Sequence, residues 1–366
     1  MSETALPGTV VAIQANYYQV RLEPLSAQEN WPYGSVPPAF LLCTRRARLK
    51  KVGQKVMVGD RVLVEEPNLD GRGAIAHVFP RKTVLMRPPV ANADQILLVF
   101  ALEEPALDAW QLSRFLVKAE SVALELCLCL NKADLVSPER QRQWQQRLNE
   151  WGYTPAFISV ANGQGLEALG ERLKQQITIL AGPSGVGKSS LIKALIPTGA
   201  AVRVGQVSGK LGRGRHTTRH VELFELHGCG LLADSPGFNQ PDLECAPSAL
   251  ADYFPEIRQR LAQGHCQFSN CLHRDEPNCV VRGDWERYEH YLKYLEEAIA
   301  RSQELHSRPD EEPSLKLKVK ESGQHQYEPK LATKKYRRLS RRQRHQSLQE
   351  YENQSLEELT EGREDL

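Results

Sequence analysis

Two motifs occur along this chain in an order that restricts its fold. Asn131-Lys132-Ala133-Asp134 precedes the glycine-rich loop Gly182-Pro183-Ser184-Gly185-Val186-Gly187-Lys188-Ser189-Ser190. Nucleotide-binding proteins that combine such motifs ordinarily have the glycine-rich loop first. A doubly wound sheet holds its ligand with loops at the carboxyl ends of its strands, so the old termini can be joined and new ones opened without moving those loops. The order therefore predicts an α/β domain with circularly permuted connectivity.

The glycine-rich loop has the composition and the context of a phosphate-binding loop. Gly182-x₄-Gly187-Lys188-Ser189 follows the apolar run QITIL and precedes the helical run SSLIKALI. Glycines let backbone N–H groups point at phosphate oxygens, and the following helix contributes its positive end. We expect residues 182–190 to bind phosphates, with Lys188 on the terminal phosphates and the Ser189 hydroxyl on Mg²⁺. The alternative is a glycine-rich turn that only caps the helix, and such a turn would not require Lys188 and Ser189.

The residues 131–134 predict that the base is guanine. They directly follow the apolar run LELCLCL, at the carboxyl end of an expected strand. A carboxylate accepts from both N1–H and the exocyclic amine of guanine, and adenine offers neither donor there. We expect Asp134 to select guanine, Asn131 to tie loops together and Lys132 to lie along the base. Ser159-Val160-Ala161, after the run PAFISV, is expected to close over guanine O6 through backbone N–H groups.

Two later segments have the order of γ-phosphate sensors. They are Gly212-Arg213-Gly214-Arg215-His216-Thr217-Thr218-Arg219-His220 and, after the run GLLAD, Asp234-Ser235-Pro236-Gly237-Phe238. We expect Thr218, in preference to Thr217, to complete the Mg²⁺ shell, Asp234 to hold a Mg²⁺-bound water, and the Gly237 N–H to reach the γ-phosphate. The alternative for the first segment is a solvated basic loop.

Phe238 is informative because it occupies the place where many GTPases have Gln to orient the attacking water. Phe cannot hydrogen-bond to water, so either hydrolysis is slow or another residue orients the water. His216 is the nearest candidate, since a neutral imidazole both accepts and donates near pH 7. The alternative is an exposed histidine in an RNA-contacting loop.

Three of the eight cysteines form a cluster with a histidine. The spacing Cys266-x₄-Cys271-x-His273-x₅-Cys279 supplies three thiolates and one imidazole. Such a set closes a tetrahedral structural Zn²⁺ site, one per chain, with no open position for catalysis. His265 competes with His273 on spacing, but its adjacency to Cys266 makes joint ligation awkward. Reduced structural cysteines are the alternative.

The 366 residues suit two or three domains. Short alternating runs in residues 1–88 predict a β-barrel, favoured as a five-stranded nucleic-acid-binding barrel over an interaction-only domain. Apolar strands alternating with amphipathic helices predict an α/β domain over 93–245. Residues 246–306 are expected to form a helical zinc-binding domain, with a helix in RGDWERYEHYLKYLEEAIARSQ, and 307–366 a charged tail that stays disordered until bound.

The net charge of +2 hides a local excess of basic residues. Residues 314–345 contain eleven Lys or Arg against two Glu, which indicates a polyanionic partner. We interpret KKYRRLSRRQRH, with Tyr336, as a phosphate-contacting arm; a solvated tail is the alternative. No run approaches the roughly 20 apolar residues of a membrane span, and MSETALPGTVVAIQ lacks the regions of a signal peptide. We therefore expect a cytoplasmic protein without a membrane partner.

The succession NKAD, SVANGQG, GPSGVGKSS, GRGRHTTRH, DSPGF and CQFSNCLHRDEPNC resembles the circularly permuted, small-subunit-dependent GTPases of the RsgA family, also called YjeQ or EngC. The resemblance covers about residues 1–300. It implies an N-terminal OB-fold, a permuted P-loop GTPase core and a C-terminal zinc domain. It also implies His216 as the catalytic histidine and Cys266, Cys271, His273 and Cys279 as the zinc ligands.

The resemblance further implies a late assembly factor that binds the small ribosomal subunit and its rRNA. Contacts with rRNA would stimulate Mg²⁺-dependent GTP hydrolysis, and hydrolysis would drive release. We expect a monomer. Two other functions fit the same motifs: a module in which GTP only switches RNA affinity while hydrolysis is incidental, and a GTP-dependent metal chaperone that transfers metal from the cysteine cluster.

Overall fold

The computed structural model describes residues 5–23, 38–68, 70–86, 88–196, 221–234, 242–307, 315–319 and 325–329. They divide into two units, Met1–Ser302 and Gln303–Leu366. Within the described ranges, every helix falls short of the length or the apolar content that crossing a bilayer requires.

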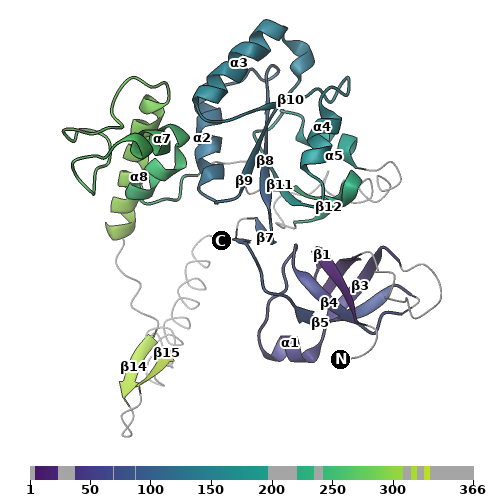
Figure 1. The fold of residues 1–366 in the computed structure, drawn as a ribbon. Coiled ribbons are helices and arrows are strands. Elements are labelled where there is room, and N and C mark those ends of the chain that lie inside the picture. Colours follow the sequence, from purple (N-terminus) through teal and green to yellow (C-terminus); the bar gives the residue numbers. More distant parts are fainter. Residues whose placement is uncertain are drawn as a thin grey trace, which may run out of the picture. The chain divides into compact units, whose positions relative to one another are not determined.

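Five short strands near the N-terminus close into a barrel (Figure 1). They are β1 Leu6–Gln14, β2 Tyr17–Leu22, β3 Phe40–Arg45, β4 Arg61–Glu65 and β5 Arg72–Val78, and the helix α1, Ala47–Lys51, follows β3. The order β1-β2-β3-β5-β4 closes where β1 pairs with β4, and β3 runs parallel to β5. Alternating residues of each strand point inward, so valine, leucine and isoleucine fill the barrel. The predicted OB-fold is confirmed.

A six-stranded sheet forms the centre of the nucleotide-binding domain. Its strands are β8 Gln95–Ala101, β9 Glu125–Asn131, β10 Ala156–Phe157, β11 Ile177–Ala181, β12 Leu223–Glu225 and β13 Leu231–Asp234. Their order is β10-β9-β8-β11-β13-β12, and all neighbours are parallel except β12 and β13. A short hairpin of β6, Val84–Met86, and β7, Pro89–Ala91, connects the barrel to this domain.

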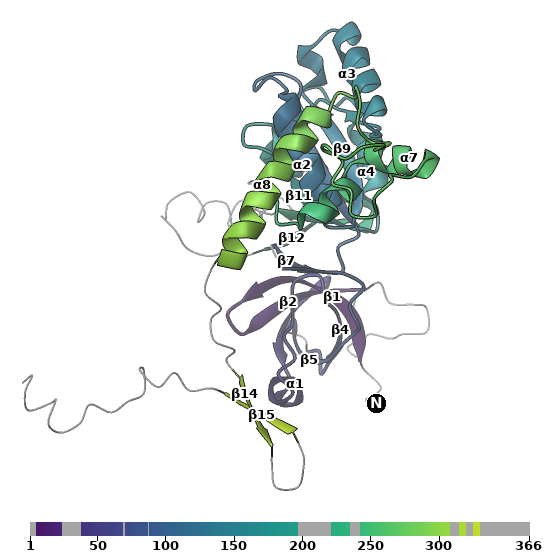
Figure 2. The ribbon, with the colours of Figure 1, turned by 90° about the vertical axis from the view of Figure 1, so that its left-hand side faces the viewer.

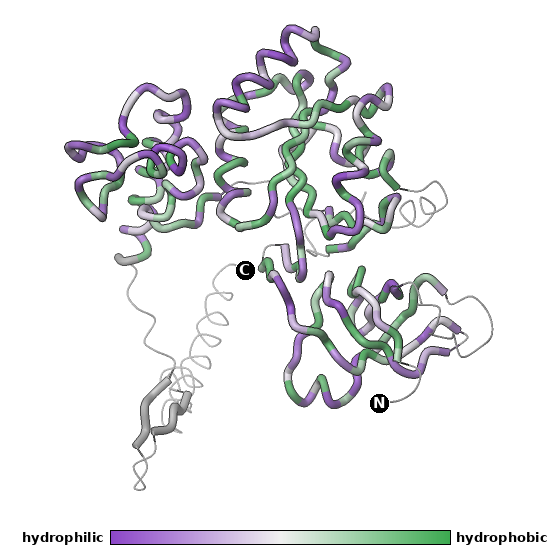
Figure 3. Tube along the Cα trace, viewed as in Figure 1, coloured by the Kyte–Doolittle hydropathy of each residue, from purple (hydrophilic) through white to green (hydrophobic). Residues whose placement is uncertain are grey.

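Helices cover both faces of the sheet (Figure 1). They are α2 Ala109–Glu120, α3 Pro138–Glu150, α4 Leu166–Arg172 and α5 Lys188–Leu195. Every residue of β8 is buried, and its side chains divide by their alternation: Ile96, Leu98 and Phe100 pack with residues of α2 and α3, while Leu97 and Val99 pack with those of α4 and α5. Figure 3 shows the contrast between the largely hydrophobic central strands and the largely hydrophilic α3.

The strand order reverses between β8 and β11. From β8 the chain continues outward to β9 and β10, whereas from β11 it continues to the opposite edge, to β13 and β12. An open α/β sheet binds its ligand at such a reversal, outside the carboxyl ends of the strands. The predicted nucleotide-binding residues therefore fall where this rule expects a ligand, at the ends of β8, β9 and β11.

The C-terminal part of the first unit packs on α2. It comprises η4 Pro247–Tyr253, α7 Pro255–Gln263 and α8 Tyr288–Ser307. Val117 of α2 belongs to the same buried cluster as Leu250, Phe254 and Tyr291, and the Tyr294 hydroxyl donates to the Trp110 carbonyl at 3.0 Å. Figure 2 shows α8 running alongside α2.

Five elements differ from the sequence-based expectation. Helix α8 begins at Tyr288 rather than Arg282, because Gly283 has a φ of +148° and the Trp285 N–H bonds back to the Gly283 carbonyl. Strand β10 spans only two residues of PAFISV. Strand β12 was not expected, since three residues give no clear alternation. In the second unit, β14, Leu315–Val319, pairs with β15, His325–Pro329, where no regular structure was expected.

Candidate functional site

The glycine-rich loop leaves β11 and leads into α5. Gly182 follows the strand with a φ of +137°, and a Cβ there would lie 2.1 Å from the Val99 carbonyl oxygen. Gly187 has a φ of +95°, and its Cβ would lie 2.4 Å from Nδ2 of Asn131. Both positions require glycine because of this backbone conformation and because a neighbouring strand or loop lies so close. The loop is thus held against β8 and against the end of β9.

Asn131 joins three loops. Its Nδ2 donates to the Val186 carbonyl at 2.9 Å, and its Oδ1 accepts from the Val160 N–H at 3.3 Å. The Ala133 N–H donates to the Ile158 carbonyl at 3.0 Å. Asn131 is only 2% exposed, so these bonds form away from water. The phosphate loop, residues 131–134 and the segment after β10 are therefore brought together.

Lys132 and Asp134, the two residues expected beside the base, differ in their contacts and exposure. Lys132 has a left-handed backbone, with a φ of +61°, and its ammonium group donates to the Glu104 carbonyl. Asp134 lies exposed in the first turn of η1, Ala133–Leu135. Its carboxylate is accessible at the carboxyl edge of the sheet.

The loop between β8 and α2 adds residues that the motif analysis missed. Glu104 contacts Lys132, and Pro105 Cδ lies 3.6 Å from the point where a Gly185 Cβ would be. This loop leaves the carboxyl end of β8, next to the phosphate loop. Its position follows from the strand order and not from a motif, which is why the motifs did not indicate it.

The segment after β10 is internally bonded. The Ser159 N–H donates to the Gln164 carbonyl at 3.0 Å, the Gly163 N–H donates to the Ser159 carbonyl at 2.9 Å, and the Asn162 N–H donates to the Ser159 hydroxyl at 3.3 Å. Ser159 is fully buried, whereas Ala161 is exposed. Ser159 therefore anchors the loop and Ala161 lies at its surface.

Lys188 points back over the phosphate loop. Its Nζ donates to the Gly182 carbonyl at 2.7 Å and to the Pro183 carbonyl at 2.6 Å. Burial lowers the pKa of Lys188, and the nearby Asp234 carboxylate acts in the opposite direction. Asp234 ends β13 beside Leu180 of β11, while Ser189 and Ser190 are exposed on the first turn of α5. The Lys188 ammonium group, the Asp234 carboxylate and the two serine hydroxyls thus lie at the same edge of the sheet.

Several predicted residues lie outside the described part of the chain. They are His216, Thr217, Thr218, Gly237 and Phe238, together with the basic tail around Tyr336.

The predicted zinc ligands converge. Ligand atoms of Cys266, Cys271, His273 and Cys279 all lie within 4.8 Å of one another. The two sulfurs of Cys266 and Cys279 are 3.8 Å apart, and His273 Nδ1 lies 3.6 Å and 3.4 Å from them. A tetrahedral Zn²⁺ with bonds of about 2.3 Å to sulfur and about 2.0 Å to nitrogen would separate its ligands by about 3.8 Å and about 3.5 Å. The four residues therefore fit Zn²⁺.

The peptide around these ligands is held by a carboxylate within it and by two tyrosines of α8. Glu276 accepts from the Leu272 N–H at 2.8 Å and from the Arg274 N–H at 2.9 Å. Burial opposes ionisation of Glu276, but these backbone donors outweigh it and lower its pKa to about 2. From α8, the Tyr288 hydroxyl donates to the His273 carbonyl at 3.0 Å and that of Tyr291 to the Leu272 carbonyl at 2.7 Å.

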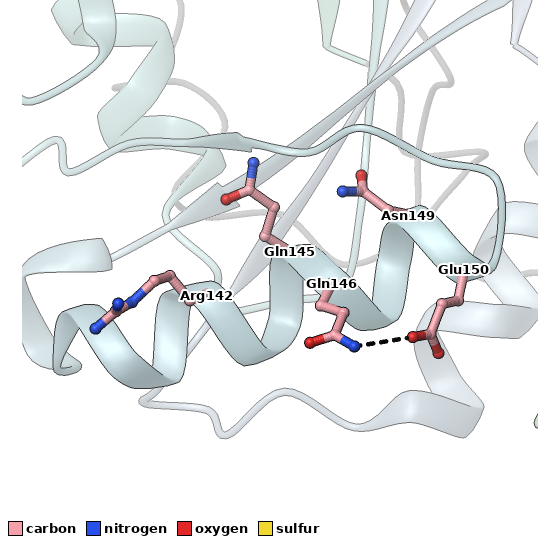
Figure 4. A pocket seen from close by; sticks show the side chains of 5 residues that line it. All are labelled: Arg142, Gln145, Gln146, Asn149 and Glu150. Atoms are coloured by element: carbon pink, nitrogen blue, oxygen red, sulfur yellow. Dashed lines mark hydrogen bonds between the residues drawn. The ribbon is translucent and has the colours of Figure 1, made fainter.

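A pocket on the outer face of α3 contains none of the predicted residues (Figure 4). It is lined by Arg142, Gln145, Gln146, Asn149 and Glu150. The Gln146 Nε2 donates to Glu150 Oε1 at 3.2 Å, so polar side chains of this face bond to each other along the helix. The pocket carries no functional assignment.

Comparisons with known proteins agree on one family. A model of the RsgA GTPase family matches residues 78–244. The chain is 62% identical over 357 residues to a small ribosomal subunit biogenesis GTPase RsgA of Microcystis aeruginosa, with 97% of each chain covered. The crystal structure of YjeQ from Thermotoga maritima has a TM-score of 0.64 at 31% identity and covers 81% of this chain and 99% of its own. YloQ, described as a circularly permuted GTPase, has a TM-score of 0.64 at 26% identity, with 81% and 96% covered.

Proposed function

The chain belongs to the RsgA GTPase family, and from that membership we infer that it is a GTP hydrolase of small ribosomal subunit biogenesis. The observation that supports this function most directly is the hydrogen bonding of Asn131 to both the phosphate loop and the segment after β10. Those bonds bring the expected phosphate-binding and base-binding residues to one edge of the sheet. GTP binds with Mg²⁺ in this family.

We propose specific roles for the residues of this edge. Backbone N–H groups of residues 182–190 bind the phosphates, and Lys188 exchanges its carbonyl partners for phosphate oxygens when nucleotide enters. Asp134 accepts from guanine, and Asn131, Lys132 and Ala133 hold it in place. Residues 159–161 cover guanine O6.

The hydrolytic residues form a second part of the proposal. Ser189 and Thr218 ligate Mg²⁺, Asp234 holds a Mg²⁺-bound water and the Gly237 N–H contacts the γ-phosphate. His216 orients the attacking water, because Phe238 cannot. The placement of Asp234 beside Lys188 supports its role.

We also propose that the barrel and the C-terminal segment bind rRNA of the small subunit, that this contact stimulates hydrolysis at a late stage of assembly, and that hydrolysis releases the protein. The zinc ion is structural, since four protein ligands leave no open position. This closed set argues against the metal chaperone. The protein acts as a cytoplasmic monomer, and the basic tail adds phosphate contacts.

Nucleotide turnover tests the proposal. Wild-type protein should hydrolyse GTP slowly alone and much faster with purified small subunits, and it should not hydrolyse ATP. Asp134→Asn should weaken GTP binding by about 100-fold or more, because the N1–H and the exocyclic amine of guanine lose their shared carboxylate acceptor. His216→Ala should retain GTP binding but lose stimulation. Asp284→Asn, the same change at an exposed position of the C-terminal segment, is the control and should behave as wild type.

Two results would count against this function. Equal GTP turnover with and without small subunits would exclude stimulation. If His216→Ala were still released from subunits as fast as wild type in single-round assays, hydrolysis would be incidental and the protein would be a GTP-switched RNA-binding module.

A further inference from the structure

The barrel contacts the edge of the nucleotide-binding sheet. Strand β12 is the last strand in the sheet order, and Ala12 of β1 forms an antiparallel bridge with Glu222, directly before β12. An edge strand exposes unpaired N–H and C=O groups, which proteins often cover. Here β1 of the barrel pairs with the residue that directly precedes the edge strand.

Strand β1 contributes to both cores, and a β-bulge lies at this contact. The register of β1 with β2 shifts between Val10 and Ala12, and both Val10 and Val11 are buried. Val10 belongs to the barrel core, whereas Val11 belongs to the same cluster as Val221 and Leu223. Neighbouring residues of a strand point to opposite faces, so Val10 fills the barrel while Val11 packs into the core of the other domain.

An ion pair crosses the same contact. Arg21 Nη1 of β2 lies 3.2 Å from Glu225 Oε1 of β12, and the two side chains are 16% and 34% exposed. The Arg21 guanidinium also donates to the Cys229 carbonyl at 3.4 Å and 3.5 Å, in the turn that joins β12 to β13. Arg21 therefore contacts both the end of β12 and the turn that follows it.

We propose that Arg21 and Glu225 are positioning residues for subunit-stimulated GTP hydrolysis. In the sequence, β12 begins a few residues after His216 and Thr218, so holding β12 on the barrel limits where that segment can end. A barrel bound to rRNA holds β12 through Ala12, Val11 and Arg21. Binding of the subunit therefore influences the hydrolytic residues through β12. This inference rests on the proposed function, because it assumes that rRNA binds the barrel and that hydrolysis is stimulated.

Charge reversal tests the pair. Arg21→Glu and Glu225→Arg each place like charges together, and each should reduce the subunit-stimulated rate of GTP hydrolysis by about threefold to tenfold. The rate without subunits should not change. The double variant restores an opposite-charge pair and should recover at least half of the lost stimulation. Recovery separates the pair from a direct contact of Arg21 with rRNA, because the double variant still lacks that arginine.

A second ion pair of the barrel supplies a matched control. Arg61 lies 2.7 Å from Glu23, and both belong to the barrel. Arg61→Glu should leave stimulation at the wild-type level if small-subunit affinity is unchanged. Full stimulation in both single Arg21 and Glu225 variants, or no recovery in the double variant despite normal subunit binding, would overturn the proposal.

Hydrogen exchange of residues 221–225 tests the contact without ribosomes. Arg21→Glu should speed exchange there, and the double variant should slow it again. Unchanged exchange in Arg21→Glu would overturn the inference even if wild-type protein is stimulated. If exchange responds as expected but wild-type protein shows no stimulation, the proposed function fails while the contact stands, and Arg21 and Glu225 then have no role in hydrolysis.

Discussion

Arg287 is fully buried and fully partnered. Its guanidinium donates to both carboxylate oxygens of Glu256, at 2.7 Å and 2.6 Å. The same group lies 4.9 Å from the ring of Trp151 and 4.7 Å from that of Phe254. Trp151 follows α3 of the nucleotide-binding domain, whereas Glu256 and Phe254 belong to the C-terminal segment. Arg287 therefore pairs with Glu256 inside the C-terminal segment and reaches the nucleotide-binding domain through its cation–π contact with Trp151.

Arg287→Met should be strongly destabilising. The change leaves the Glu256 carboxylate buried without its counter-ion, which costs about 3–5 kcal/mol of unfolding free energy. Arg287→Met combined with Glu256→Leu should cost less, since no unpaired charge remains. The measurement is denaturant unfolding followed by tryptophan fluorescence.

The exposed pair Arg301–Glu244 offers the control. Its nitrogen–oxygen distance is 3.2 Å, with side chains 42% and 46% exposed. Arg301→Met should cost less than about 1 kcal/mol, because water already screens this pair. Equal losses of unfolding free energy for Arg287→Met and Arg301→Met would contradict the larger cost expected of a buried unpaired carboxylate.

At the scale of elements, α8 and the zinc-ligand segment support each other. The segment between α7 and α8 has few apolar residues, and two tyrosines of α8 bond to its backbone carbonyls. A short segment of this kind draws its folding free energy from the metal. Apolar periodicity predicted strands β8, β9, β11 and β13, but it did not predict the start of α8, because the backbone at Gly283 ends the helical pattern before Tyr288.

Removal of zinc should loosen α8 and spare the nucleotide site. With a chelator, or in Cys266→Ser, hydrogen exchange should accelerate in residues 265–291, since Tyr288 and Tyr291 lose ordered acceptors. Affinity for GDP should stay within about twofold, because the phosphate loop belongs to other buried clusters. Cys229→Ser, an exposed cysteine outside the cluster, should change neither. Unchanged exchange in the metal-depleted protein would refute the structural role.

At the scale of the whole molecule, the barrel is not an independent module. Val11, Val58 and Val90 share one buried cluster with Ile96 and Leu98 of the central strand β8. The hairpin β6–β7 strengthens the connection, since the Ala91 N–H donates to the Val58 carbonyl at 2.8 Å. The domains predicted as successive blocks of sequence therefore have partly common cores.

Removing the barrel should destabilise the rest of the chain. A chain that starts at residue 80 loses Val11 and Val58 from the cluster and exposes Val221. Burial of each of these three side chains stabilises the fold by about 1.5–3 kcal/mol. Its melting temperature should fall, and it should bind a hydrophobic dye. A chain ending at residue 307 should melt like the full protein, because it lacks only residues of the second unit. Equal melting of the barrel-deleted and full chains would contradict the shared core.

The sequence by itself determined which chemistry to expect. Gly182, Lys188, Asp134 and the Cys266 cluster are recognisable because phosphate, guanine and zinc each require particular atoms at short spacing along the chain, and strand periodicity places those atoms at loop ends. The reversed motif order likewise indicated the permuted sheet.

Only the tertiary structure decided how the parts are joined. The bulge at Val11, the Arg21–Glu225 pair and the buried Arg287 connect residues far apart in sequence, and none belongs to a motif. Their effect depends on which surfaces meet, since an arginine or a valine has the same local pattern whether it faces water or another domain. Contacts of this kind follow from packing, which no short stretch of sequence encodes.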